Sequence, residues 1–192
     1  MIAIIKYNAG NISSVQNALT RLGYESIITD DETLILSADK VILPGVGEAS
    51  SAMKYMIEKG LDRIILSIKK PMLGICLGQQ LMCEFSEEGN TNCLGIFNTQ
   101  VKKFPATDIV PHMGWNSFAK IEGDLFKKIE PKDNVYFVHS YYAEINEQTT
   151  AVCDYIKPFS AAMQYDNFYA TQFHPEKSAD IGEQILKNFL EL

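Results

Sequence analysis

Residues 72–85 read MLGICLGQQLMCEF, an apolar run that ends at a glycine-flanked cysteine and is followed by a second apolar run. The pattern predicts a buried strand over 72–75 and a helix over 77–85. A cysteine at such a turn is typical of a nucleophile elbow, which projects its side chain at the carboxyl end of the sheet. The positive end of the helix dipole favours a thiolate there. Cys76 is therefore a candidate nucleophile, although a buried structural cysteine fits this segment equally well.

Strand and helix patterns alternate before this segment, which predicts a parallel sheet with helices on both faces. The expected strands are 2–6, 25–28 and 41–43, and the expected helices are 12–22, 50–59 and 61–69. Short runs rich in β-branched and aromatic residues follow at 134–138, 150–155, 160–165 and 169–173. We expect a hairpin turn at Asp166-Asn167 and a last helix with Ser178 at its N-cap. The prediction is one domain over 1–192: an α/β fold with a doubly wound, mostly parallel sheet flanked by helices and an antiparallel C-terminal extension.

The composition favours a globular domain and argues against a nucleic-acid-binding, metal-binding or membrane-spanning protein. The 192 residues are 46% hydrophobic and 21% charged, which suits one large α/β domain with its own core. Lys and Arg number 17 against 24 Asp and Glu, a net charge of −7 that argues against a nucleic-acid partner. The four cysteines lack the spacing of a metal site, and no apolar run reaches the roughly 20 residues that span a bilayer. We expect a cytoplasmic protein with no metal, no cofactor and no membrane association.

A candidate base lies at the end of the last expected strand, in the segment TQFHPE over 171–176. His174 and Glu176 are two residues apart on an extended segment, so both side chains can face the same way. A cysteine nucleophile needs such a pair, because the imidazole takes the thiol proton and the carboxylate holds the imidazole tautomer. Taken alone, the pair fits a surface turn or a structural hydrogen bond. Together with the elbow it predicts a thiol–imidazole–carboxylate triad.

The two segments GICLGQQL (74–81) and FHPE (173–176) resemble the signatures of the class I, or triad, glutamine amidotransferase family. The resemblance covers essentially the whole chain and implies hydrolysis of L-glutamine to glutamate and ammonia. It implies that Cys76 is the nucleophile, His174 the general base and then acid, and Glu176 the orienting carboxylate. It also implies that Gln80 helps to hold the glutamine substrate.

Four further segments are similar to the glutaminase subunits of imidazole glycerol phosphate synthases: GNISS (10–14), PGVG (44–47), PHMGWN (111–116) and HSY (139–141). This resemblance implies an oxyanion hole formed by the N–H groups of Leu77 and of Val46 or Gly47. It implies substrate contacts from Gly45, Ser140 and Tyr141. It places Asn11, Met113, Trp115 and Lys177 at a partner interface. The implied partner is a separate (β/α)8-barrel cyclase that forms a heterodimer with this chain and uses the ammonia in histidine biosynthesis.

Other interpretations stay open from the sequence. PGVG also fits an ordinary tight turn, and Trp115 on composition alone fits the core. His112 is expected to be structural or at an interface, His139 structural, and the other three cysteines packing residues. The function could instead be that of a glutaminase subunit of another synthase, such as pyridoxal phosphate synthase. The remaining alternatives are a stand-alone thiol hydrolase and a non-catalytic binding subunit.

Overall fold

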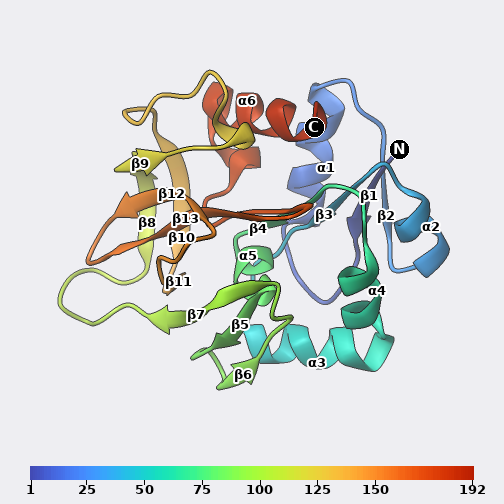
Figure 1. The fold of residues 1–192 in the computed structure, drawn as a ribbon, viewed down its shortest axis with the longest axis horizontal. Coiled ribbons are helices and arrows are strands. Elements are labelled where there is room, and N and C mark those ends of the chain that lie inside the picture. The colour runs from blue at the N-terminus through green and yellow to red at the C-terminus, as the bar shows by residue number, and fades with distance from the viewer.

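The computed structural model describes residues 1–192 and is built on a mixed eight-stranded sheet (Figure 1). The first five strands in the sheet are parallel: β2 (Ser26–Thr29), β1 (Ile2–Ile5), β3 (Lys40–Leu43), β4 (Met72–Ile75) and β14 (Phe168–Thr171). The sheet continues with antiparallel strands: β13 (Pro158–Tyr165), β12 (Thr149–Asp154) and β9 (Lys120–Ile121). The predicted parallel sheet and its antiparallel extension are therefore confirmed.

Helices cover both faces of the sheet. Successive residues of a strand point to opposite faces, and the central strands carry apolar residues on both, so both faces must be buried. In β1, Ile2 and Ile4 pack with one core cluster, whereas Ala3 and Ile5 pack with the other. One face is covered by α1 (Ile12–Arg21), α6 (Ala179–Leu190) and the short 3-10 helix η1 (Asp124–Phe126). The opposite face is covered by α2 (Glu32–Ser37), α3 (Ala49–Lys59), α4 (Leu61–Ser67) and α5 (Leu77–Met82). Figure 1 shows α1 and α6 on one side of the sheet and α3, α4 and α5 on the other.

Two smaller sheets lie beside the carboxyl end of β4, where Cys76 follows the strand. One pairs β8 (His112–Asn116) with β10 (Val135–His139) in antiparallel register. The other has the order β11 (Tyr141–Ala143), β7 (Phe97–Lys103), β5 (Cys83–Ser86) and β6 (Thr91–Asn92). The short 3-10 helix η2 (Pro175–Lys177) joins β14 to α6.

Most of the predicted elements agree with the structure to within one or two residues, but the helix expected over 77–85 is shorter. It ends at Met82, and the prediction that it continues to Phe85 is wrong. Cys83 begins strand β5, which pairs in parallel with β7 through Cys83 and Phe97. Pairing with a strand distant in sequence therefore overrides the local helical pattern. Helix α2 and the strands β5, β6, β7, β8, β9 and β11 were not predicted.

The hairpin turn at Asp166-Asn167 is confirmed, since Tyr165 pairs with Phe168 across it. Ser178 occupies the N-cap position of α6, but its side chain makes no capping hydrogen bond. Its hydroxyl instead donates to the His174 carbonyl oxygen at 2.6 Å and accepts from the Tyr136 N–H at 2.9 Å. Ser178 thus ties the segment that carries His174 to strand β10.

None of the helices combines the length and the apolar character needed to cross a membrane.

Candidate active site

Cys76 lies at the junction of β4 and α5 with φ 55° and ψ −107°, a conformation that non-glycine residues rarely adopt. The flanking glycines leave room for this turn. A Cβ atom at Gly78 would lie 2.0 Å from the Leu43 carbonyl oxygen, and one at Gly74 would lie 2.9 Å from the Gly78 backbone. The strained turn with two obligatory glycines confirms the predicted elbow geometry.

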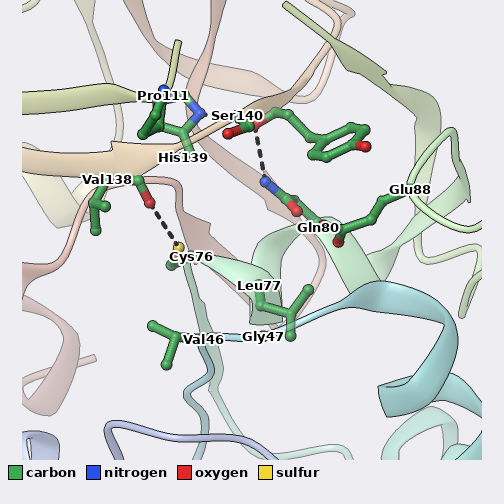
Figure 2. A pocket seen from close by; sticks show the side chains of 11 residues that line it. Val46, Gly47, Cys76, Leu77, Gln80, Glu88, Pro111, Val138, His139 and Ser140 are labelled. Carbon is green, nitrogen blue, oxygen red and sulfur yellow. Dashed lines mark hydrogen bonds between the residues drawn. The ribbon is translucent and has the colours of Figure 1, made fainter.

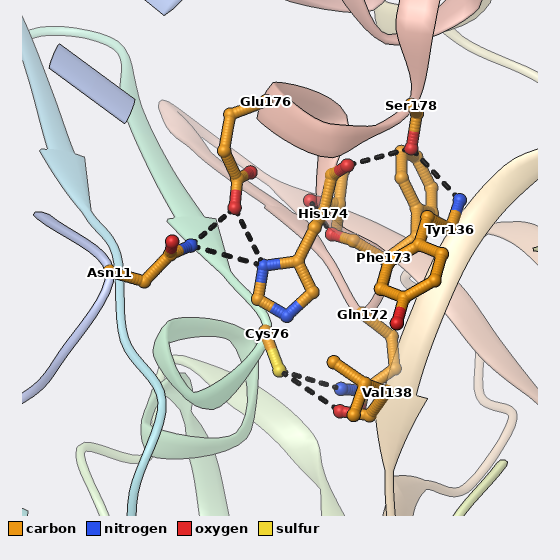
Figure 3. A network of polar contacts seen from close by, with 10 residues as sticks. Asn11, Cys76, Tyr136, Val138, Gln172, Phe173, His174, Glu176 and Ser178 are labelled. Atoms are coloured by element: carbon orange, nitrogen blue, oxygen red, sulfur yellow. Dashed lines mark hydrogen bonds and ion pairs between the residues drawn. The ribbon is translucent and has the colours of Figure 1, made fainter. Parts of the chain in front are cut away.

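His174 and Glu176 meet as the sequence predicted, in a buried hydrogen bond (Figure 3). The His174 Nδ1 atom lies 2.7 Å from Glu176 Oε1. Because a carboxylate only accepts hydrogen bonds, Nδ1 carries the proton, and the neutral imidazole presents a lone pair on Nε2. Nε2 is buried without a hydrogen-bond partner, and Figure 3 shows this edge of the ring directed toward Cys76. The free nitrogen is thus placed to accept the thiol proton.

The surroundings of the imidazole control its protonation. Burial lowers the pKa of His174, but the nearby charge of Cys76 and the hydrogen bond to Glu176 outweigh it and raise the pKa to about 10. Once Nε2 has accepted a proton, the raised pKa stabilises the imidazolium, which is the form that can donate a proton to a leaving group. The geometry therefore suits nucleophilic attack by sulfur followed by proton donation to a leaving group.

Asn11 contacts the carboxylate of the triad, a position that the sequence did not predict. Its side-chain Nδ2 donates to Glu176 Oε1, and its backbone has the left-handed φ of 71° at the start of α1. The half-buried amide therefore holds the carboxylate that in turn holds His174. The expected place of Asn11 at a partner interface stays a prediction.

Two atoms contact the Cys76 sulfur in this structure (Figure 3). The thiol donates to the Val138 carbonyl oxygen at 3.9 Å, and the Gln172 Nε2 donates to the sulfur at 3.7 Å. Gln172 was not singled out from the sequence, where it reads as one more residue of a buried strand end.

A cavity of 310 Å³ opens above Cys76 and lies within the range of about 300–1,000 Å³ that is usual for small-molecule sites. Figure 2 shows its lining: Val46, Gly47, Cys76, Leu77, Gln80, Glu88, Pro111, Val138, His139, Ser140 and Tyr141. Seven of the predicted catalytic, oxyanion and substrate residues are therefore brought together here. Gly45 does not line the cavity, and a Cβ atom at this position would lie 2.0 Å from the Tyr7 hydroxyl.

The predicted oxyanion donors differ in their availability. The Leu77 N–H donates to the Gly45 carbonyl oxygen at 3.2 Å, so it is occupied in this conformation. The N–H groups of Val46 and Gly47 donate no hydrogen bond. Movement of the segment 44–47 would be needed for Leu77 to face an oxyanion.

Gln80 and Glu88 form the polar wall of the cavity (Figure 2). The Gln80 Nε2 donates to the Tyr141 carbonyl oxygen at 3.0 Å and to Gln172 Oε1 at 2.9 Å. Glu88 accepts the Ala49 N–H at 2.9 Å and has no cationic partner, and burial raises the pKa of its carboxyl group. Sequence reasoning missed Glu88, because the surrounding EEGN reads as an ordinary solvent-exposed turn. Its carboxylate is the one acidic side chain on the cavity wall.

Three of the four residues expected at a partner interface are exposed: Met113, Trp115 and Lys177. Met113 is 63% exposed and Trp115 55% exposed, so the alternative of a core tryptophan is wrong. Lys177 is exposed next to Glu176 and makes no ion pair within the chain. Met113 pairs in register with Val138, whose carbonyl oxygen contacts Cys76. The exposed apolar face of β8 is therefore only one strand away from the nucleophile.

No three His, Cys, Asp or Glu side chains are grouped so that they could hold a metal ion. His112 and His139 are buried, and both lie outside the triad.

Comparisons with known proteins identify the family. Residues 3–192 match the family model described as Glutamine amidotransferase class-I. A protein of Bacteroides fragilis (strain YCH46) described as imidazole glycerol phosphate synthase subunit HisH is 59% identical over 194 residues, covering 100% of this chain and 99% of that protein. A protein of Vibrio parahaemolyticus with the same description is 46% identical, covering 100% of this chain and 98% of that protein.

Solved structures show the same fold at low identity. A Thermoplasma acidophilum protein described as part of a GMP synthase gives a TM-score of 0.79 at 19% identity, covering 100% of this chain and 92% of that one. A structure described as a glutamine amidotransferase gives 0.74 at 18% identity, covering 100% of this chain and 98% of that one. With the family model matched over nearly the full length, this chain belongs to the class-I glutamine amidotransferase family.

Proposed function

We propose that this chain is the glutaminase subunit of an imidazole glycerol phosphate synthase, which hydrolyses L-glutamine and delivers ammonia to a separate cyclase in histidine biosynthesis. The relatives at 59% and 46% identity, both described as that subunit, support the assignment over the full chain. The single structural observation that carries it is the unpartnered His174 Nε2, which is directed toward Cys76 and backed by the hydrogen bond from Nδ1 to Glu176. We propose that residues 1–192 act as one amidotransferase unit.

The first half of the reaction forms a thioester. The Cys76 thiol gives its proton to His174 Nε2, and the thiolate attacks the side-chain carbonyl carbon of glutamine. The carbonyl oxygen becomes an oxyanion, which the free N–H groups of Val46 or Gly47 would stabilise. His174 then returns the proton to the nitrogen as the carbon–nitrogen bond breaks and ammonia leaves. Glu176 keeps the imidazole in the required tautomer throughout.

The second half releases glutamate. Water attacks the thioester carbonyl while His174 accepts one of its protons, and the oxyanion forms again at the same N–H groups. The carbon–sulfur bond then breaks, and the proton on His174 restores the Cys76 thiol or remains in the ion pair. One water is consumed for each glutamine, and no cofactor is required.

Substrate recognition needs groups that complement the amino-acid end of glutamine. The half-buried Glu88 carboxylate offers a negative charge for the α-ammonium group, and Gln80 beside it adds polar contacts. The backbone of Ser140 and Tyr141 lines the same wall and can contact the α-carboxylate. Gly45 would contribute to substrate binding only after a change in the segment 44–47.

The partner is proposed to be a (β/α)8-barrel cyclase that forms a heterodimer with this chain. The exposed apolar side chains of Met113 and Trp115 lie on β8, and the unpaired Lys177 follows Glu176 in the chain, which supports a docking face there. Ammonia loses its nucleophilicity when protonated in water, so direct transfer to the partner avoids that loss. Because the Leu77 N–H is held by Gly45, we propose that activity is low in the isolated chain and rises with the cyclase and its ligand. The four unpaired cysteines support a reducing, cytoplasmic setting.

Glutamate release from glutamine tests this function. We expect slow release by the isolated chain, faster release with the cyclase and its ligand, and none from a Cys76→Ala variant in either condition. Equal turnover with and without the cyclase would favour a stand-alone thiol hydrolase. No release in any condition would favour a non-catalytic binding subunit.

A further inference from the structure

The side-chain amide of Gln172 is fully buried at the end of β14 and contacts the reacting sulfur atom (Figure 3). Its Nε2 lies 3.7 Å from Cys76 Sγ, and its Oε1 accepts a hydrogen bond from Gln80 Nε2 at 2.9 Å. Neither contact is needed to assemble the triad. The triad mechanism therefore assigns no role to this amide.

The direction of the amide is determined by its neighbours. The Tyr141 carbonyl oxygen can only accept, so the Gln80 amide must present its NH₂ group to it, at 3.0 Å. The same NH₂ group donates its other hydrogen to Gln172 Oε1. With its oxygen so engaged, the Gln172 amide must turn its own NH₂ group toward the sulfur.

A second set of contacts holds the Tyr141 carbonyl in place. His139 Nδ1 lies 2.7 Å from this oxygen and must therefore carry its proton. His139 Nε2 is then an acceptor for His112 Nδ1 at 3.0 Å. The His112 Nε2 in turn faces the Asn116 Nδ2 at 3.4 Å. Burial keeps both histidines neutral, because it lowers the pKa of His139 to about 3 and that of His112 to about 4.

We propose that Gln172 is a further catalytic residue, whose N–H stabilises the Cys76 thiolate, and that Gln80 and His139 are positioning residues that keep this amide in its donating orientation. When the thiol loses its proton, it also loses its hydrogen bond to the Val138 carbonyl oxygen. The Gln172 N–H then remains as a donor to the negative sulfur, and hydrogen bonds to the charged form favour that form. The inference rests on the proposed role of Cys76 as nucleophile.

The test compares two buried glutamines, of which only Gln172 contacts Cys76. Gln172→Met removes the donor to Cys76 and the acceptor for Gln80 with little change of volume, and Gln79→Met is the matched control. Gln79 is also fully buried, but its Nε2 donates to the Ser160 carbonyl oxygen at 2.9 Å and does not contact Cys76. The measurement is the rate of Cys76 alkylation by iodoacetamide across a pH series, followed by mass spectrometry of the peptide that contains Cys76. This assay needs no glutamine, so it measures the reactivity of the Cys76 thiolate independently of the proposed glutaminase activity.

We expect Gln172→Met to alkylate about tenfold more slowly near neutral pH, with the midpoint of the pH profile raised by about one unit. Gln172→Glu keeps the shape but brings a carboxylate to the sulfur, so its midpoint should rise further. Gln79→Met should keep the wild-type midpoint. The proposal is overturned if Gln172→Met keeps the wild-type rate and midpoint, or if Gln79→Met shifts them as much. Thermal melting of each variant identifies loss of folding. If Gln172→Met does not fold, Gln172→Glu takes its place: a raised midpoint supports the proposal, and an unchanged or lowered midpoint overturns it.

Discussion

The backbone N–H of Leu77 donates a hydrogen bond to the carbonyl oxygen of Gly45 at 3.2 Å. This contact occupies the donor nearest to the nucleophile, at the position where an oxyanion would develop. The N–H groups of Val46 and Gly47 are free in the same conformation. Cys76, His174 and Glu176 are therefore in place while one of the two donors proposed for the oxyanion hole is still occupied.

Lys177→Ala should lower activation by the cyclase several-fold, because its unpaired ammonium lies next to Glu176 at the proposed docking face. The measurement is the ratio of glutamate release with and without the cyclase and its ligand. Lys187→Ala, at an exposed position on α6, serves as the control and should keep the wild-type ratio. An unchanged ratio in Lys177→Ala would remove this residue from the docking face.

Asn11→Asp should lower kcat for glutamate release by about tenfold or more, because it replaces a donor to Glu176 with a second carboxylate. Aspartate tolerates the left-handed backbone at this position, where φ is 71°, so folding should be little affected. Steady-state kinetics on the activated complex measure the change. Asn8→Asp introduces the same charge at an exposed neighbour that does not contact the triad, and it should be silent. Equal losses in the two variants would contradict a role of Asn11 in holding the carboxylate.

Glu88→Gln should raise KM for glutamine by about tenfold and leave kcat nearly unchanged, because it removes the negative charge proposed to meet the α-ammonium group. Glu87→Gln is the matched control, since Glu87 is exposed and pairs with Lys102 at 3.4 Å outside the cavity. Loss of such a surface pair costs little. A Glu88→Gln variant with wild-type KM would exclude the carboxylate from substrate binding.

His139 should make the protein less stable in acid. Its pKa in the folded chain is lowered, mainly by burial, to about 3 from an ordinary 6.5. The contribution of neutral His139 to the free energy of unfolding is thus fully present above pH 6.5. It is lost as the pH falls toward 3, by up to about 1.4 kcal/mol per pH unit. Urea unfolding at a series of pH values should show this acid limb in the wild type and a shallower limb in His139→Asn.

His174 supplies the internal control for this pH dependence, because its shift has the opposite sign. Its pKa is raised from 6.5 to about 10, so its stabilising contribution is present below pH 6.5 and is lost as the pH rises toward 10. His174→Gln should therefore flatten the alkaline limb and leave the acid limb in place. An acid limb that is the same in His139→Asn and the wild type would show that other groups cause it.

The order of strands and helices in the parallel half could be predicted from the sequence, because each element there carries its own periodic apolar pattern. The strand over Met72–Ile75 is an example, since its residues are all buried and its bounds agree with the prediction. The second half is harder to predict. Strand β8 exposes Met113 and Trp115, so its apolar residues do not mark the buried face. Strand β5 has the local pattern of a helix end, because only pairing with the distant β7 makes Cys83 extended.

The elbow at Cys76 and the pair His174–Glu176 were determined by the sequence alone, because glycine spacing and a two-residue separation constrain the backbone locally. The contact of Asn11 with Glu176, and the places of Glu88 and Gln172 near Cys76, appear only in the tertiary structure. Asn11 meets Glu176 across 165 positions, and Gln172 meets Cys76 across 96. No local pattern encodes such contacts, because they depend on how α1 packs beside the carboxyl ends of the neighbouring strands β4 and β14. The tertiary structure also decided that the Leu77 N–H is held by Gly45, since a backbone donor has no sequence signature.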